Sequence, residues 1–248
     1  MLGVVLLYVG VVLIVNGIWL VGQARAAAIA SRTPAMETAA VGSTVRSGGG
    51  VYAGEAAAGQ ELGGEEVAVP PPRGEDHPLF IQNREVAILN IFTGIIGFAI
   101  ALTFIVVGNG FATSLRPVEA ASSQLNILVG GTVLLFAFTY LWVAYNQYAN
   151  AGGRGLGWYS AFVAVTAVYA GVWVVQNTPD NNTADLWLAA DWFAWAVLWA
   201  MFFALLTLQL PIARITGYVA IVVGIGTSWA FALALLWGKL ALAFPPPS

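Results

Sequence analysis

The stretch DWFAWAVLWAMFF, Asp191–Phe203, decides the fold. It is almost entirely apolar, and it carries Trp192, Trp195 and Trp199 at spacings of three and four residues. On an α-helix, residues at positions i, i+3, i+4 and i+7 share one face. The spacing therefore predicts one helix with its three tryptophans on one side, and Leu188 extends that line by one turn.

The composition of the whole chain indicates the solvent around that helix. Of 248 residues, 59% are hydrophobic and 8% are charged, and the mean hydropathy is +0.81. Soluble domains carry about 25% charged residues, so this chain has too few charges to cover a surface that faces water. A membrane-spanning helix needs about 20 mostly apolar residues. We therefore expect an all-α integral membrane protein, a bundle of six transmembrane helices surrounded by membrane lipid, at Leu2–Val21, Val86–Val107, Leu125–Tyr145, Trp158–Val175, Leu186–Leu208 and Gly217–Leu240.

The spans contain few groups that could carry covalent chemistry. The chain has no cysteine, which excludes disulfides and thiolate metal sites. The only histidine, His77, lies in a hydrophilic stretch, and the spans lack paired carboxylates. General acid–base or metal catalysis therefore has almost nothing to use, and we expect no enzyme, no cofactor and no metal site. The net charge of −3 is too small to indicate a nucleic-acid partner.

The distribution of basic residues predicts the orientation in the membrane, because Lys and Arg collect in cytoplasmic loops. The fourth connection between spans holds acids without any basic residue, and the second holds only Arg116. The odd-numbered connections are therefore predicted to be cytoplasmic and both termini to lie outside. The arginines of those odd-numbered connections are Arg25, Arg32, Arg46, Arg73, Arg84, Arg154 and Arg214.

The first connection, residues 24–84, differs from the rest of the chain. It is rich in Ala, Gly and Glu and includes SGGG and VPPPRGEDHP. Such a segment buries too little apolar surface to offset the entropy of ordering it. We interpret it as a flexible cytoplasmic insertion in a single membrane domain, residues 1–248. A docking site for a partner and a cap over the cytoplasmic mouth remain alternatives.

The position of the tryptophans along the span distinguishes two roles. Tryptophans are favoured at membrane interfaces, which suits Trp187 and Trp237 near helix ends. Trp195 and Trp199 lie well inside the span. A buried indole N–H without a partner is costly in lipid. These two rings should therefore face protein or a water-accessible path.

The other polar groups of the spans are sparse and mostly neutral. Such residues either hold helices together or line a path, and both roles stay open for Asn16, Asn90, Asn126, Tyr140, Asn146 and Tyr169. A carboxylate at the midplane would cost ~2.5–3.5 kcal/mol, so we expect Asp191 to reach the outer interface. Ion-coupled transporters and ion channels need charged or coordinating groups in the membrane. A path without them suits a small, neutral, planar solute such as urea or a short amide.

Five stretches, in order along the chain, carry a family resemblance: MLGVVLLYVGVVLIVNG (1–17), EVAILNIFTG (85–94), FAFTYLWVAYN (136–146), GWYSAFVAV (157–165) and WFAWAVLW (192–199). They resemble the AmiS/UreI family of urea and short-chain amide channels. The resemblance covers about three quarters of the chain, is weakest in the sixth span and leaves out residues 24–84. It implies a hexameric ring in a bacterial cytoplasmic (inner) membrane, one pore per protomer, and a cytoplasmic amidase or urease that uses the permeant.

The resemblance also implies which residues line the pore. Asn16 and Tyr140 would offer hydrogen bonds, and aliphatic residues of the first span would exclude ions. Since the first and fifth spans both run inward, Leu2 and Leu6 belong beside Trp192 near the outside. The expected pore-lining, substrate-binding residues are Leu2, Leu6, Val9, Leu13, Asn16, Phe136, Tyr140, Trp192, Trp195, Leu198 and Trp199.

Two departures from the acid-gated members of that family favour its amide-channel branch. Those channels carry histidines in external loops and a glutamate in the sixth helix. Here the external connections contain no histidine, the matching helix position is Val223, and Leu188 stands where such channels have a further tryptophan. Histidine titrates near pH ~6.5 and makes acid gating simple, so we expect no steep activation by external acid.

Two other classes of function remain open. A secondary transporter coupled to protons would use Asp191 as its proton carrier. A membrane scaffold would recruit a partner through residues 24–84, and its tryptophans would only pack the bundle.

Overall fold

The computed structural model describes residues 2–31, 79–108 and 120–243, and every regular element in these ranges is helical. Six helices are long and apolar enough to cross a membrane, which confirms the predicted six-helix bundle. The first five are α1 (Leu2–Ala30), α3 (Asn83–Gly108), α4 (Ala120–Ala149), α5 (Arg154–Asn177) and α6 (Thr183–Leu206). The sixth span joins α7 (Ala213–Val223), a π-helical segment η3 (Gly224–Trp229) and α8 (Ala230–Leu236).

The first helix runs farther than its apolar stretch. It continues to Ala30 instead of ending at Val21, through the run ARAAAIA. Alanine is the strongest helix former, so the helix continues after the sequence has ceased to be apolar enough for lipid. The predicted flexible insertion, 24–84, thus begins inside α1 and ends inside α3, and its residues 32–78 lie outside the described residues.

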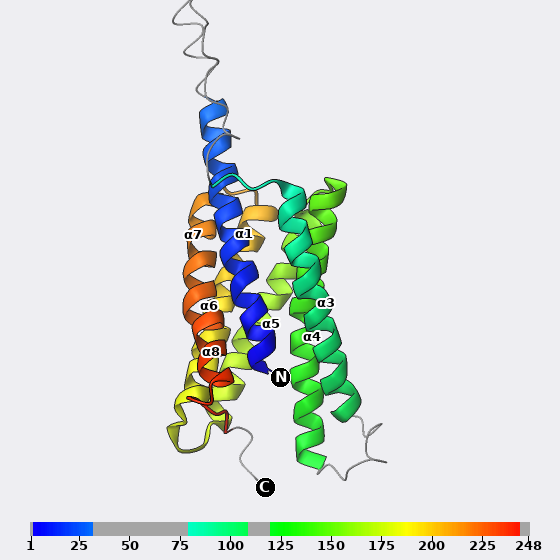
Figure 1. Cartoon of the computed structure of the whole chain (residues 1–248), viewed down its shortest axis with the longest axis vertical. Coiled ribbons are helices and arrows are strands. Elements are labelled where there is room, and N and C mark those ends of the chain that lie inside the picture. The colour runs from blue at the N-terminus through cyan, green and yellow to red at the C-terminus, as the bar shows by residue number, and fades with distance from the viewer. Residues whose placement is uncertain (1, 32–78, 109–119, 244–248) are drawn as a thin grey trace, which may run out of the picture.

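The bundle is arranged around α1. Helix α3 packs along α4 and helix α5 along α6. Helix α1 (blue) lies between the sixth span and the α3–α4 pair, with its N-terminal end at the same end of the bundle as α8 (Figure 1). Helix α6 begins with a side-chain cap, because Asn182 Oδ1 accepts hydrogen bonds from the backbone N–H groups of Ala184 and Asp185. The buried Asp185 in turn accepts the N–H of Ala243, 3.0 Å away, which holds the chain after α8 against α6.

Glycine brings the backbones of α1 and the sixth span together. A methyl group on Gly17 would lie 2.5 Å from the Gly217 carbonyl oxygen, and one on Gly10 would lie 2.6 Å from the Trp229 nitrogen. Gly224 meets α1 in the same way, since a methyl group there would lie 2.9 Å from the Gly10 carbonyl oxygen. Helices in membranes associate through such small residues because lipid gives them no hydrophobic drive to do so.

We predict that Gly17→Ala destabilises the protein by about 1–3 kcal/mol, the usual effect of overpacking a well-packed interior. The measurement is thermal unfolding of the detergent-purified protein, followed by tryptophan fluorescence. Gly131→Ala is the matched control, because a methyl group on Gly131 meets nothing within 4 Å. Equal melting temperatures for the two variants would show that the close contact of α1 with α7 does not matter for stability.

Candidate functional site

Two of the cavities in the described part of the bundle have different walls. The apolar cavity, about 110 Å³, is lined by Leu2, Val5, Leu6, Val9, Leu128, Val129, Thr132, Val133, Phe136, Thr166, Tyr169, Ala170, Trp173, Val174, Leu188, Trp192 and Trp195. The polar cavity, about 360 Å³, is lined by Leu13, Asn16, Trp19, Leu20, Asn83, Thr139, Tyr140, Val143, Asn146, Gln147, Asn150, Ala151, Gly153, Leu156, Ser160, Trp199, Phe202, Leu205 and Leu206. Among the described residues the two cavities share no lining residue. Phe136 of the apolar cavity meets Trp199 of the polar cavity, and we call the rings at this meeting point the barrier.

Aromatic rings form that barrier. The Phe136 ring of α4 lies 5.5 Å from Trp192, 5.2 Å from Trp195 and 5.8 Å from Trp199, measured between ring centroids. Trp192 and Trp195 also meet edge to face at 5.2 Å. The three tryptophans of α6 thus share one face, as their spacing predicts, and a single phenylalanine closes against all of them.

Trp195 satisfies its indole N–H within the bundle. It donates to Thr227 Oγ1 at 3.0 Å, and the Thr227 hydroxyl donates to the Val223 carbonyl at 2.6 Å. Thr227 belongs to the π-helical segment η3, which interrupts the α-helical sixth span. Single π-helical turns are frequent at functional sites because they re-aim side chains. Here the segment supplies the partner that a tryptophan inside the membrane needs.

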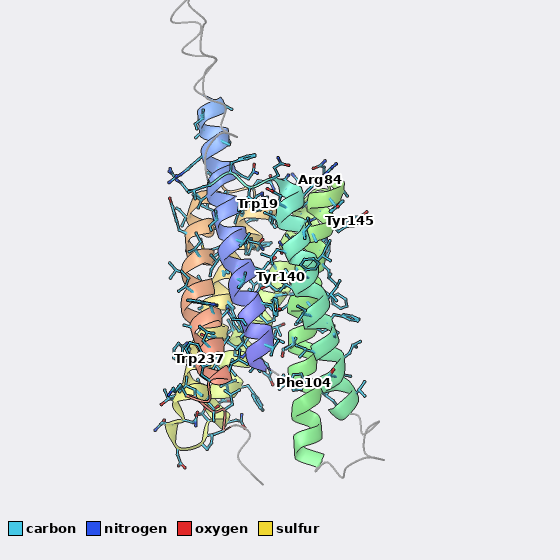
Figure 2. The ribbon with its side chains drawn as sticks, viewed as in Figure 1. Trp19, Arg84, Phe104, Tyr140, Tyr145 and Trp237 are labelled. Carbon is cyan, nitrogen blue, oxygen red and sulfur yellow. The ribbon has the colours of Figure 1, made fainter. Side chains whose placement is uncertain are left out.

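The polar cavity is bordered by amide side chains. Trp19 donates from Nε1 to Asn83 Oδ1 at 3.1 Å, and Gln23 reaches the same oxygen at 3.3 Å. Asn16 is paired with the buried Asn90. The Tyr140 hydroxyl is buried and has no hydrogen-bond partner among the described residues. Figure 2 shows Tyr140 at mid-height, between the ribbons of α1 and α4, and Trp19 near the end of the bundle that carries Arg84.

The residues expected to line a pore divide between the two cavities. Leu2, Leu6, Val9, Phe136, Trp192 and Trp195 line the apolar cavity. Leu13, Asn16, Tyr140 and Trp199 line the polar cavity. In the described part of the chain, Leu198 lines neither, because it is 1% exposed and packs in the core.

Helix α5 contributes more to the apolar cavity than was predicted from the sequence. Thr166, Tyr169, Ala170 and Trp173 line the apolar cavity. Their spacings of three and four residues resemble those of the tryptophans on α6, so the same rule could have found them. Tyr169 was expected to point inward, but 66% of its surface is exposed, so it lies at the rim of the cavity.

Two further asparagines were expected either to hold helices together or to line a path. Asn146 lines the polar cavity, together with the adjacent Gln147 and with Asn150 one turn farther along. The side chain of Asn126 lies outside the described residues. Within residues 2–31, 79–108 and 120–243, no group of three histidine, cysteine or acidic side chains is placed to hold a metal ion.

The expectation that Asp191 reaches the outer interface is wrong. Its side chain is 0% exposed, and its carboxylate oxygens accept no hydrogen bond from the described residues. It follows Leu188 by three residues and precedes Trp195 by four, which places it on the inward side of α6. It nevertheless lines neither cavity as far as the described residues define them.

Comparisons with known proteins agree with this architecture. A family model described as AmiS/UreI family transporter matches residues 1–39 and 79–239. An acid-activated urea channel of Helicobacter pylori (strain J99) is 33% identical over 162 residues, which is 60% of this chain and 82% of that protein. A putative amidate substrates transporter of Mycolicibacterium smegmatis is 36% identical over 114 residues, 46% of this chain and 51% of that protein. The cryo-EM structure of the Helicobacter pylori urea channel in its closed state covers 97% of this chain and 100% of its own, with a TM-score of 0.63 and 25% identity.

We predict that Thr227→Val destabilises the protein by about 1–3 kcal/mol, since it leaves the buried indole N–H of Trp195 without an acceptor. The measurement is the melting temperature in detergent. Thr103→Val is the matched control, because the exposed Thr103 hydroxyl also donates to a carbonyl of its own helix but accepts no indole. If both substitutions have the same small effect, the Trp195–Thr227 hydrogen bond does not stabilise the bundle.

Proposed function

The chain belongs to the AmiS/UreI family, and we propose that it forms a passive channel for small, neutral, planar solutes, namely urea and short-chain aliphatic amides. The observation that carries this proposal is the pair of cavities separated by aromatic rings inside a bundle of six membrane-length helices. The solute class is taken from relatives named as a urea channel and as a putative amidate substrates transporter.

In this proposal the two cavities contribute differently to solute selection. The apolar cavity offers a hydrated ion nothing to replace its water, so entry of ions is strongly unfavourable. A planar solute can pass between Phe136 and the tryptophan faces and then exchange hydrogen bonds in the polar cavity. In this proposal the pore-lining residues are Leu2, Leu6, Val9, Leu13, Asn16, Phe136, Tyr140, Trp192, Trp195 and Trp199, with Leu198 supporting them from the core.

The apolar cavity favours amides over urea. Its two threonine hydroxyls donate to their own helices, Thr132 to Leu128 at 3.0 Å and Thr166 to Phe162 at 2.9 Å. Urea is polar on every edge and would lose hydrogen bonds there. Acetamide and propionamide carry an alkyl group, and each CH₂ removed from water contributes about 0.8 kcal/mol.

We further propose that the protein lies in a bacterial cytoplasmic (inner) membrane with both termini outside. The arginines of the odd-numbered connections support this orientation. It places the apolar cavity towards the outside and the polar cavity towards the cytoplasm, where an amidase or a urease would consume the permeant.

A homohexameric ring is also a proposal. Large apolar side chains are exposed on the outer faces of α4 and α5, including Tyr145 at 67%, Phe162 at 73% and Val165 at 72%. Such faces suit lipid or a neighbouring copy of the chain equally well, and the family resemblance supports the neighbouring copy.

The buried Asp191 favours a second candidate, a transporter coupled to protons. A coupling carboxylate must meet the path from each side in turn. Asp191 lines neither cavity in the described part of the protein, so the passive channel accounts better for the geometry.

A scaffold that acts through residues 24–84 would leave both cavities without a role. An enzyme would need reacting groups that the spans do not supply, so we propose that the solute passes unchanged.

We predict rapid passive flux of urea and acetamide into proteoliposomes, faster for acetamide, measured by stopped-flow swelling. Trp195→Ala and Trp199→Ala should each change this flux severalfold, because both rings border the barrier. Trp237→Ala is the matched control, since Trp237 is 70% exposed near the end of the sixth span. Flux no faster than in empty liposomes would remove the channel proposal. Saturable flux that stops when the proton gradient collapses would favour the coupled transporter.

We predict no steep acid activation. External acidification from about pH 7 to about pH 5 protonates histidine, whose ordinary pKa is about 6.5, and the predicted external connections contain none. Acetamide flux should therefore change less than about twofold over that range. The measurement is the same swelling assay at fixed internal pH, with empty liposomes as the control. A severalfold rise on acidification would contradict the proposed departure from acid-gated relatives.

A further inference from the structure

We propose that Asn90, a residue that lines neither cavity, sets the solute selectivity of the pore by fixing the carboxamide of Asn16. The inference rests on the proposed function, because it assumes that solute passes Asn16 in the polar cavity. Asn90 is 0% exposed on α3, and Asn16 is 8% exposed on α1.

The two side chains form a reciprocal pair. Asn16 Nδ2 donates to Asn90 Oδ1 at 3.1 Å, and Asn90 Nδ2 donates to Asn16 Oδ1 at 2.8 Å. Asn90 Nδ2 also donates to the Val86 carbonyl of its own helix, at 2.8 Å. Both N–H groups of the Asn90 amide are therefore used.

The Val86 carbonyl fixes the orientation of both amides. A backbone carbonyl can only accept, so the Asn90 atom that faces it must be the NH₂ group. This places the Asn90 oxygen towards the Asn16 nitrogen, and the Asn16 oxygen towards the Asn90 nitrogen. The O and N positions of a paired amide are assigned from such a network. Here the Val86 carbonyl determines the O and N positions of both Asn90 and Asn16.

Pairing with Asn90 leaves part of the hydrogen-bonding capacity of the Asn16 amide unused. An amide group has two N–H donors and two acceptor lone pairs, and Asn90 uses one of each. Asn16 thus presents one N–H and one lone pair, and its side chain borders the polar cavity. The partnerless hydroxyl of Tyr140 borders the same cavity. An amide or urea, which carries a carbonyl and an N–H group, can meet the Asn16 donor and acceptor together.

Without Asn90 the Asn16 amide would lose this orientation. Asparagine in a helix can turn back and donate to the carbonyl four residues earlier, as Asn177 does to Trp173 at 2.8 Å. An Asn16 side chain that did so would withdraw a donor from the cavity. Asn90 is therefore a positioning residue, and its effect should appear in selectivity rather than only in stability.

The test is the ratio of acetamide to glycerol permeability in proteoliposomes. Asn90→Thr removes the partner of Asn16, while its hydroxyl can still donate to the Val86 carbonyl, as Thr93 donates to Leu89. We expect the ratio to fall roughly three- to tenfold in Asn90→Thr and Asn16→Ala alike, the usual size of one side-chain hydrogen bond between membrane helices. The double variant should be no worse than Asn16→Ala, because Asn90 acts through Asn16.

Thr93→Val is the matched control. Thr93 is buried on the same helix, its hydroxyl donates to the Leu89 carbonyl of that helix, and it makes no hydrogen bond to Asn16, so the ratio should not change. An unchanged ratio in Asn90→Thr, with a lowered ratio in Asn16→Ala, would overturn this inference but leave the proposed channel intact. An equal loss of acetamide and glycerol flux would show that Asn90 is structural, and would also overturn it. Absence of acetamide flux in the wild type would instead remove the proposed function and the inference with it.

Discussion

The close backbone contact between α1 and the sixth span determines which residues of α1 can border the cavities. It occurs at Gly10, Gly17, Gly217 and Gly224, where any side chain would meet a backbone atom of the other helix. This contact fixes the rotation of α1 about its own axis. The face beside it, with Leu2, Leu6, Val9 and Leu13 at spacings of four and three, then borders the cavities. Lipid supplies no hydrophobic force between helices, so shape at the glycines has to hold this arrangement.

Two indole N–H groups inside the bundle are satisfied by partners on other helices. Trp195 of α6 uses Thr227 of the sixth span, and Trp19 of α1 uses Asn83 of α3. Each pair joins a residue that borders a cavity to a helix beside it. The same hydrogen bonds that stabilise the bundle therefore also orient the groups that a solute would meet.

The sequence predicts the spans and the tryptophan face of α6 because both depend on local patterns, whereas the other expected pore-lining residues came from the family resemblance. Hydropathy locates six helices, and the spacing of three and four residues puts the tryptophans of α6 on one face. A local pattern says that a residue such as Leu198 faces inward, but not whether it faces a cavity or, as Leu198 does, the packed core. Asp191 was misplaced for another reason: the cost of burying a carboxylate predicts exposure, and no local pattern reveals that the neighbouring helices bury it. The Asn16–Asn90 pair joins residues 74 apart in sequence, so no periodicity could reveal it. The extension of α1 to Ala30 was missed because hydropathy marks the lipid boundary and not the end of the helix.

In the proposed channel, the aromatic barrier accounts for the passage of an amide and the exclusion of an ion. In this structure Phe136 closes against three tryptophans at centroid distances of 5.2–5.8 Å. Each such aromatic contact contributes only about 0.5–1.5 kcal/mol beyond its buried area. A planar amide that enters between the rings replaces ring contacts with contacts to its own faces, so the barrier to it stays low. An ion that enters the same gap must lose hydration worth several kcal/mol or more, and aromatic faces cannot replace that loss. In the proposed channel, selection against charge thus depends on the absence of polar groups at the barrier. Selection among neutral solutes would depend on the donor and acceptor that Asn16 presents in the polar cavity.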